Sequence, residues 1–353
     1  MSSRPSTIDD VARAAGVARV TVSRVLNNEQ NVRRETREKV RRAVEALGYT
    51  VNLQARALAS GAGRAILLVY SHDPEREPNS YYHSGLELGA LRACSALGLD
   101  LITRAVDPAS ENRARLLSSI IERERPAGIV LSPPLSDDLE LLEGVKRAGV
   151  RVVAVSAGEQ ARSAVPSAGI DERAAGFAMG EYLVSLGHRR IGFVNGPSDH
   201  LAAGLRFDGF LEALKAGGIR QRPWTATGDF TFKSGVTAAE HLLSSGERVT
   251  ALACANDDMA AGAMLALHRA GLDIPADISV MGFDDTPMSE VIWPPLTTIR
   301  QPIKDIAERA VQMLVQRAAD EPASCELLPH ELVVRESTGA PARKPMRLTR
   351  PSL

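Results

Sequence analysis

Residues 7–28 read TIDDVARAAGVARVTVSRVLNN, and this stretch decides the fold of the first part of the chain. Thr7 followed by Asp10 predicts a helix start, because a threonine hydroxyl at the N-cap accepts a backbone N–H and a nearby carboxylate faces the positive helix end. Gly16 ends this helix, and a second helix is expected to begin after Val17 and Ala18. Two short helices joined by a glycine-containing turn predict a helix-turn-helix, whose second helix fits the major groove of DNA.

The second helix has two faces of different character. Val22, Val25 and Leu26 form its inner face, and its outer face carries Arg19, Val20, Thr21, Ser23 and Arg24. A third helix is expected over about residues 35–47, with Val40, Val44 and Leu47 inward and basic residues outward. A generic three-helix bundle with a charged surface would show the same periodicity, so periodicity alone leaves both interpretations open.

The charge of the chain is distributed unevenly between its first part and the rest. The 353 residues carry a formal net charge of -1, but residues 1–60 hold 11 Lys and Arg against 6 Asp and Glu. The remainder is acidic, with 31 basic against 37 acidic residues. A basic segment is what phosphate binding requires, and a solvated charged helix would look similar.

The composition excludes several classes of protein. At 44% apolar and 24% charged residues the chain is globular and long enough for two or three domains. Its apolar runs are far shorter than the roughly 20 residues that span a bilayer, and residues 1–7 lack the pattern of a secretory signal. We therefore expect a cytoplasmic protein without a membrane partner. Cys94, Cys254 and Cys325 suit small buried residues better than disulfides or metal ligands.

The first segment, together with VRRETREKVRRAVEALGY at residues 32–49, closely resembles the DNA-binding head of the lactose/galactose repressor (LacI/GalR) family. The resemblance implies that the recognition helix reads bases mainly through Arg19 and Val20, with Arg24 later on the same helix. Arginine can donate two hydrogen bonds to guanine, and valine can contact a thymine methyl group. Thr21 and Ser23 would anchor phosphates. The full set of implied DNA contacts is Thr7, Arg19, Val20, Thr21, Ser23, Arg24, Asn27, Ala55 and Leu58.

The chain departs from the family pattern at the helix caps. Ala18 stands where a Ser or Thr usually caps the recognition helix, and such a cap contributes roughly 1 kcal/mol. Arg33 and Arg34 replace the small polar residue that usually caps the third helix. They are either further phosphate contacts or part of a solvated loop.

Residues 50–58 match the hinge helix of the family, which folds on operator DNA and inserts a leucine pair into the minor groove. Leu58 matches that wedge and Ala55 lies beside it. The segment is too short to be stable as an isolated helix, and apolar wedges that unstack base steps are an established minor-groove device. Val51 stands where proline is common in the family.

From Arg64 onward short apolar runs alternate with helical patterns. We expect strands at 65–69, 99–104, 128–131, 152–155, 167–170, 190–194, 250–253 and 279–283. We expect helices at 82–97, 111–124, 174–186, 203–216 and 257–270. Alternation of this kind predicts an α/β fold with parallel sheets covered on both faces, and its length predicts two lobes.

This body resembles the effector-binding core of the same family, which is similar to periplasmic sugar-binding proteins. The resemblance rests on LGHRRIGFVNGP, LRFDGFLEAL, CANDDMAAGAM, DISVMGFDD and PPLTTIRQP. It implies a head at 1–50, a hinge and linker at 51–63 and a core at 64–340, before a tail at 341–353 that we expect to be disordered. Lobe one would comprise 64–162 and 293–323, and lobe two 163–292 and 324–340.

Ligands of such folds bind beyond the carboxyl ends of the strands and between lobes. The resemblance implies effector contacts at Ser71, Tyr82, Arg206, Phe230, Asn256 and Asp284. Arg206 would supply donors and Asp284 acceptors, as a hydroxylated or heterocyclic ligand requires. Three alternatives remain open: Asp284 as a helix cap, Phe230 as plain core and Arg206 as a surface residue. The side chains of Tyr81, Tyr82 and Phe230 suit a pyranose, a nucleoside or another planar ligand.

These observations together predict a homodimeric DNA-binding transcription regulator, in this family most often a repressor, whose affinity for a near-palindromic operator responds to a sugar or sugar derivative. Higher oligomers and either direction of the response remain open. No catalytic residues, metal or cofactor are expected, since the chain lacks a GxxxxGK loop, a GxSxG elbow and an HExxH motif, which leaves His188 structural. The alternatives are a solute-binding protein of a sugar transporter, which needs no basic head, and a sugar-metabolising enzyme.

Overall fold

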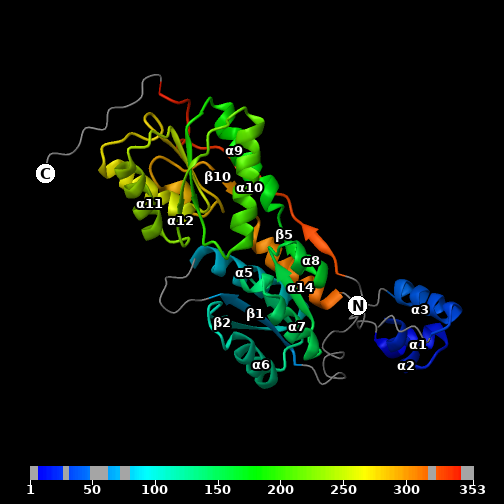
Figure 1. Ribbon diagram of the computed structural model, residues 1–353. Coiled ribbons are helices and arrows are strands. Elements are labelled where there is room, and N and C mark those ends of the chain that lie inside the picture. Colours follow the sequence, from blue (N-terminus) through cyan, green and yellow to red (C-terminus); the bar gives the residue numbers. More distant parts are fainter. Residues whose placement is uncertain (1–6, 27–31, 48–62, 72–79, 317–322, 343–353) are drawn as a thin grey trace.

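The computed structural model of the chain describes residues 7–26, 32–47, 63–71, 80–316 and 323–342. Figure 1 shows a head of three short helices and two α/β lobes, as the sequence predicted. Asn27, Ala55 and Leu58 lie outside the described residues, as does the tail from residue 343. Within the described residues, no helix combines the length and the apolar character needed to cross a membrane.

The head is built from α1 (Ile8–Ala15), α2 (Arg19–Leu26) and α3 (Arg34–Ala46). Its own small core consists of Val11, Ala12, Val22, Val25, Val40 and Ala43, all of which are buried. These residues recur at helical spacing on the facing sides of the three helices, so burial of this apolar stripe holds the head together.

Lobe one contains a six-stranded sheet in the order β11-β5-β4-β3-β1-β2, in which every neighbouring pair is parallel. Its strands are β1 (Ala65–Ser71), β2 (Asp100–Val106), β3 (Gly128–Leu131), β4 (Val152–Val155), β5 (Ser167–Gly169) and β11 (Cys325–Leu327). Its helices are α5 (Ser80–Leu97), α6 (Arg113–Glu124), α7 (Leu139–Arg147), α8 (Glu159–Ala164) and α14 (Ile303–Gln316), with a 3-10 turn at Leu135–Asp137.

Lobe two contains a four-stranded parallel sheet in the order β7-β6-β8-β9. Its strands are β6 (Ile191–Asn195), β7 (Trp224–Thr227), β8 (Ala251–Cys254) and β9 (Ser279–Met281). Its helices are α9 (Glu172–Ser185), α10 (Leu201–Ala216), α11 (Phe232–Ser245), α12 (Asp257–Arg269) and the short α13 (Met288–Val291). In Figure 1, α9 and α10 cover one face of this sheet, and α11 and α12 cover the other.

All the expected strands and helices form, each within two residues of its expected bounds. The sequence pattern missed the edge strand β7 and three-residue strands such as β11, because so few residues show no periodicity. Cys94 and Cys254 are buried as expected, but Cys325 is exposed, since it lies on the edge strand β11.

The pairing of the shortest strands divides the core differently from the expected lobe boundaries. β5 pairs with β4 and β11 pairs with β5, so both strands extend the sheet of lobe one. β10 (Thr298–Arg300) pairs with β12 (Glu331–Val333). Isolated bridges join Thr297 to Met281 at the end of β9 and Arg300 to Asp284. The chain therefore passes between the lobes after β5, after β10 and after β11. The hydrogen bonds of strands only three residues long determine where the chain crosses between the lobes. Sequence periodicity does not reveal these hydrogen bonds.

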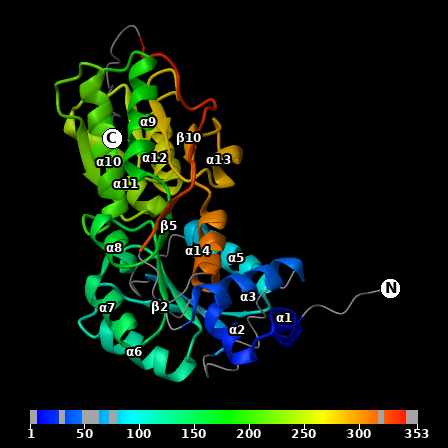
Figure 2. The same ribbon diagram turned by 90° about the vertical axis from the view of Figure 1, so that its right-hand side faces the viewer.

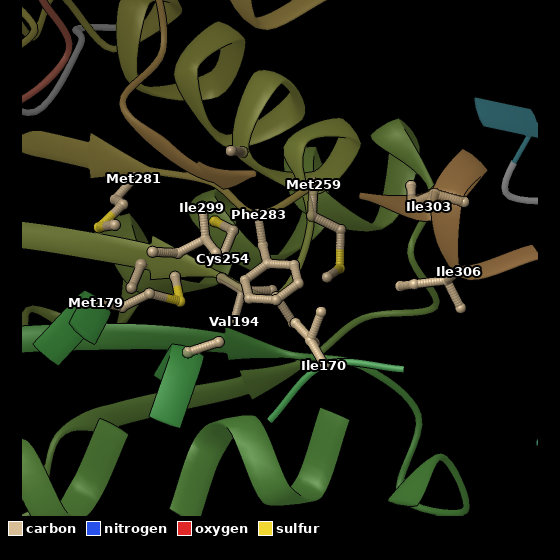
Figure 3. Packing of buried hydrophobic residues seen from close by; sticks show 14 of the residues in the cluster. Ile170, Met179, Val194, Cys254, Met259, Met281, Phe283, Ile299, Ile303 and Ile306 are labelled. Atoms are coloured by element: carbon tan, nitrogen blue, oxygen red, sulfur yellow. The ribbon is translucent and has the colours of Figure 1, made fainter. Parts of the chain in front are cut away.

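A continuous cluster of buried apolar residues runs from lobe two into the crossing segments and α14. Figure 3 shows the Phe283 ring near Val194 and Ile170, with Ile303 and Ile306 of α14 further along the same layer. A buried side chain of this size stabilises the fold by about 1.5–3 kcal/mol. The residues that follow β9 are thus held firmly where the lobes meet. The second view, in Figure 2, shows α5 and α14 beside each other near the junction.

Candidate functional site

The first helix of the head begins with the expected capping box. The Thr7 hydroxyl accepts the Asp10 main-chain N–H at 3.3 Å, and the Asp10 carboxylate accepts the Thr7 main-chain N–H at 2.9 Å. The Thr7 hydroxyl also donates to Asp10 Oδ2 at 2.6 Å, and this bond, followed by the one from the Thr7 main-chain N–H, lowers the pKa of Asp10. The helix ends at Gly16, whose φ of 64° is left-handed and whose N–H bonds to carbonyls of the last turn. This turn sets the angle at which α2 leaves α1.

The recognition helix α2 presents the predicted faces. Val22 and Val25 are buried in the head core. On the opposite side, Arg19, Val20 and Arg24 are exposed, and Thr21 and Ser23 are half-buried. A valine side chain that remains 59% exposed, as that of Val20 does, contributes little to the head's own stability.

The guanidinium of Arg19 has one weak ion pair, to Asp9 at 3.8 Å, and both side chains are mostly exposed at 64% and 58%. Exposed pairs of this kind contribute at most about 1 kcal/mol. The contact therefore orients Arg19 at the start of α2 without preventing it from exchanging Asp9 for another acceptor.

The start of α2 offers a direct test of the missing cap. The Ala18 carbonyl accepts the main-chain N–H groups of Thr21 and Val22, so Ala18 occupies the N-cap position but has no side-chain oxygen. We expect Ala18→Ser to stabilise the head by about 0.5–2 kcal/mol, because serine can accept a free N–H of the first turn. Thermal or urea unfolding of the head measures the change, with Ala14→Ser on the exposed side of α1 as control. No gain, or an equal gain from the control, would contradict the capping argument.

A cavity of about 150 Å³ lies between the lobes, at the carboxyl ends of β6, β7 and β8. All six expected effector residues line it: Ser71, Tyr82, Arg206, Phe230, Asn256 and Asp284. Ser71 and Tyr82 come from lobe one, and the other four come from lobe two. Such a volume holds on the order of ten water molecules, which is comparable to one sugar ring.

Arg206 is buried in the wall of this cavity, with 4% exposure, and is not a surface residue. Its Nε and Nη2 donate to Glu172 Oε2 at 3.2 and 2.8 Å, and its Nη1 donates to the Ala255 carbonyl. The guanidinium also stacks 3.3 Å from the centre of the Phe283 ring. These bonds use three of the five N–H donors of arginine, which leaves donors for a ligand.

The position of Arg206 depends on the close contact of α9 with α10. A Cβ added at Gly176 would overlap the main-chain carbonyl of Arg206, so only glycine lets the two helices approach this closely. Glu172, one turn earlier on α9, thereby comes within reach of the guanidinium. The ion pair between Glu172 and Arg206 therefore depends on the close packing of α9 against α10.

Asp284 lines the same cavity and is close enough to Arg206 for the two charges to interact. Its φ of 110° is strained for a residue other than glycine, and strain of this kind concentrates at ligand sites. Its Oδ1 accepts the Gln301 side-chain amide at 2.5 Å, while no hydrogen bond to Oδ2 occurs among the described residues. Burial raises the pKa of Asp284 well above its ordinary value, and the charge of Arg206 opposes this. Asp284 does not cap a helix, because α13 begins after Pro287.

Asn256 and Phe230 are coupled to each other. Asn256 caps α12 through a bond from the Met259 N–H at 3.0 Å, and its side-chain amide donates to the Phe230 carbonyl at 2.9 Å. Phe230 is half-buried with a φ of 66°, and its ring meets the edge of His200 at 4.9 Å. Burial and then the charge of Arg206 lower the pKa of His200 to about 4, so this ring is neutral near pH 7.

The wall from lobe one carries hydroxyl groups. The Ser71 hydroxyl donates to the Pro133 carbonyl at 3.1 Å. Burial strongly raises the pKa of Tyr82, although a hydrogen bond with Ser156 lowers it, so the phenol stays protonated as a donor. Both side chains can bond to hydroxyl groups of a bound molecule.

Sequence reasoning missed several residues of the cavity wall: Ser156, Glu172, Asp199, His200, Asp229 and Gln301. Ser156, Asp199 and Asp229 follow β4, β6 and β7 closely, so the rule that ligands gather at the carboxyl ends of strands could have identified them. No sequence signal marks Glu172 as the partner of Arg206, because the two lie on different helices.

His188 is structural, as the sequence predicted. It is buried, its Nδ1 lies 2.9 Å from Thr250 Oγ1, and its Nε2 lies 2.9 Å from the Gly339 carbonyl. Burial lowers its pKa. It ties the last segment of the chain to lobe two and lies outside the cavity wall.

Comparison with known proteins adds family information to this geometry. Residues 7–52 match the model for bacterial regulatory proteins of the lacI family, and residues 181–338 match a periplasmic binding protein-like domain. Catabolite control protein A of Priestia megaterium is 31% identical over 94% of this chain and 99% of its own length.

Two solved structures share nearly the whole chain. One is the transcriptional regulator CelR in complex with cellobiose, with a TM-score of 0.71 and 31% identity over 95% of this chain and all of that one. The other is a lac repressor dimer bound to operator, with a TM-score of 0.70 and 30% identity over 96% of this chain and all of that one. The similarity thus includes the head as well as both lobes.

Proposed function

The chain belongs to the LacI family of bacterial regulatory proteins, and from this premise we propose that two copies bind a near-palindromic operator through their heads while a neutral sugar in the interlobe cavity controls their affinity. Its relatives across the full length are transcription regulators, so it is a regulator and not an enzyme. The single observation that carries this proposal is the presence, in one chain, of a helix with exposed arginines and an enclosed polar cavity.

A solute-binding protein of a transporter would need the cavity but not the head. The basic charge of residues 1–60 and the exposed face of α2 have no purpose in such a protein. We therefore prefer the regulator, and we assign it to the cytoplasm because its DNA target lies there. An electrophoretic mobility shift with a selected duplex separates the two functions.

In the proposed complex, α2 enters the major groove. Arg19, Val20 and Arg24 contact base edges, and Thr21 and Ser23 bond to phosphates, because the first three are exposed on the outer face and the latter two flank it. Thr7 and Asn27 complete the phosphate contacts. Since a two-fold dimer matches a two-fold site, each half-site binds one head.

Leu58, with Ala55 beside it, is proposed as the minor-groove wedge of the hinge. We expect Leu58→Ala to weaken specific binding and to reduce DNA bending, because a smaller side chain cannot unstack a base step. Bending is measured by the mobility of circularly permuted operator fragments. Leu53→Ala, in the same segment, is the matched control, and equal bending by the Leu58→Ala variant would remove the wedge from the account.

The charges around the cavity favour a neutral ligand with many hydroxyl groups. Four acidic residues line it, Glu172, Asp199, Asp229 and Asp284, whereas Arg206 is the one lysine or arginine in the described part of the lining. Because Arg206 is already paired with Glu172, an anionic ligand would meet mostly negative charge. Hydroxyl groups can instead donate to Asp284 and accept from Arg206. The similar CelR structure was solved with cellobiose.

The response to the ligand is proposed to act through lobe closure. The cavity wall takes residues from both lobes, so a ligand that contacts both stabilises the closed arrangement over the open one. The three segments that cross between the lobes carry the rotation to the hinge. The cavity and the head are two distinct sites, and the open–closed equilibrium of the lobes couples them. The coupling is allosteric whether the ligand weakens or strengthens operator binding.

The domain organisation follows from these assignments. We assign the head to residues 1–50, the hinge and linker to 51–63, and the core to 64–340. Strand pairing supports lobe one over about 64–170 and 302–328, and lobe two over about 171–301 and 329–340.

Selection from a random pool of duplexes tests this function directly. The full-length protein should enrich a near-palindrome whose half-sites lie about 10 base pairs apart or at a multiple of this spacing. A thermal-shift screen of neutral sugars and their phosphate esters then identifies the effector, and we expect a neutral sugar. Failure to enrich any palindrome at low salt would overturn the proposal, and a preference for phosphate esters would overturn the effector class.

A further inference from the structure

A second cavity lies at the opposite end of lobe two. It has a volume of about 130 Å³ and opens where β6, β7 and β8 begin, next to Ile191, Trp224 and Val249. The interlobe cavity lies where the same parallel strands end. The two cavities are therefore separated by the full length of the sheet, and neither the proposed effector site nor the head includes this second one.

Four arginines line this second cavity: Arg189, Arg190, Arg222 and Arg248. Glu247 is the one acidic residue in the described part of the lining. Four like charges around one small volume repel one another, and this costs folding free energy. We call this arrangement the arginine pocket.

Most of this positive charge lacks a partner among the residues that the structure describes. Arg189 Nη1 donates to the Gly217 carbonyl at 2.6 Å, which satisfies the end of α10. For Arg190, Arg222 and Arg248, the described residues provide no ion pair and no hydrogen bond from the guanidinium. Other arginines of lobe two do have partners, as Arg173 has in Asp208 and Glu212. The guanidinium groups of the arginine pocket are thus available to a ligand.

Part of the lining of the arginine pocket is apolar and aromatic. Leu214, Ile219 and the half-buried Trp224 line the pocket together with the arginines. The Trp224 ring is packed 5.9 Å from His241, which fixes its position. A hollow of this shape admits a small molecule, whereas a macromolecule requires a wide surface.

We propose that the arginine pocket binds a small phosphorylated molecule carrying two or more negative charges. Guanidinium groups recognise phosphate oxygens with paired hydrogen bonds, and clustered arginines favour multivalent anions. The ligand is chemically distinct from the neutral molecule proposed for the interlobe cavity. The chain then responds to two ligands at opposite ends of lobe two.

Titration of the full-length protein with inorganic pyrophosphate at constant ionic strength tests this proposal. Calorimetry should show saturable binding, and Trp224 fluorescence should change with the same midpoint. Orthophosphate, which has fewer charges, should bind more weakly. Trp224→Phe should abolish the fluorescence change but retain the heat of pyrophosphate binding. This result would place the bound pyrophosphate beside Trp224. Absence of saturable heat at millimolar pyrophosphate would overturn the proposal.

Matched arginine variants separate a built site from general surface charge. Arg222→Gln and Arg248→Gln should each weaken pyrophosphate binding about tenfold or more, because each removes charge-assisted bonds. Arg220→Gln removes an exposed charge from the same loop but lies outside the cavity lining, and it should change affinity little. Equal losses in all three variants would mean diffuse attraction and would overturn the site.

A variant of the interlobe cavity separates this inference from the proposed effector. Asp284→Asn should impair the sugar response and leave pyrophosphate affinity unchanged. A changed pyrophosphate affinity in this variant, for example tighter binding because a like charge is removed, would place the anion between the lobes and contradict the inference. The measurement does not require DNA, so failure of operator binding leaves the test of the arginine pocket intact.

Discussion

Arg206→Ala is expected to lose effector binding and about 3–5 kcal/mol of unfolding free energy at once. The substitution removes the guanidinium that supplies donors to the cavity and leaves the Glu172 carboxylate, which is 2% exposed, without its positive partner. Removing one member of a buried ion pair typically costs this much, because the remaining charge stays desolvated. Urea unfolding gives the stability, and calorimetry with the identified sugar gives the binding.

The double variant Arg206→Ala/Glu172→Gln separates the two losses. It should recover much of the stability, because no charge is then buried unpaired, but it should not recover sugar binding. Operator affinity without sugar should stay near that of the wild type in the double variant, since the head has its own core. Sugar binding by the double variant would show that Arg206 is a structural residue and not a ligand contact.

Arg19→Ala is expected to relax the preference at one base position of each half-site. A good arginine–guanine contact discriminates by about 1–3 kcal/mol, and a dimer makes it twice, so specific binding should weaken by about 2–6 kcal/mol in total. The exposure of Arg19 and its weak contact with Asp9 mean that the substitution leaves the fold of the head intact. Binding-site selection with the variant measures the change in preference.

Arg34→Ala provides the matched loss of charge. Arg34 lies at the start of α3, its side chain is 93% exposed, and it pairs with Glu38. Its loss should weaken binding to all sequences similarly and lower the salt dependence, without a change in base preference. If Arg19→Ala behaved in this way too, Arg19 would be a phosphate contact and not a reader of sequence.

The sequence allowed the head and most of the core to be predicted, for physical reasons that individual elements illustrate. The capping pair Thr7 and Asp10 and the turn at Gly16 are local interactions, so a short stretch of sequence contains all their determinants. Strands such as β3 (Gly128–Leu131) are runs of buried apolar residues between helical patterns, and their bounds were predicted without error.

What escaped prediction depends on contacts between distant parts of the chain. The pairing of β11 with β5 joins residues about 160 positions apart and moves the lobe boundary. The charge pair of Glu172 with Arg206 depends on how closely α9 approaches α10. The arginine pocket likewise brings together three loops that are separate in the sequence. Each loop carries one or two arginines, and no sequence pattern marks them as a site. Resemblance named the six cavity residues, but only the fold shows which bonds they already make.

Control of the head by the interlobe cavity is tested by the dissociation constant of the selected operator with and without a saturating concentration of the identified sugar, measured by fluorescence anisotropy at fixed salt. We expect this dissociation constant to change by at least about fivefold in the wild type, as coupled sites typically show. The double variant Arg206→Ala/Glu172→Gln should show the same operator affinity in both conditions. An unchanged operator affinity in the wild type, with the sugar demonstrably bound, would contradict the claim that the interlobe cavity controls the head.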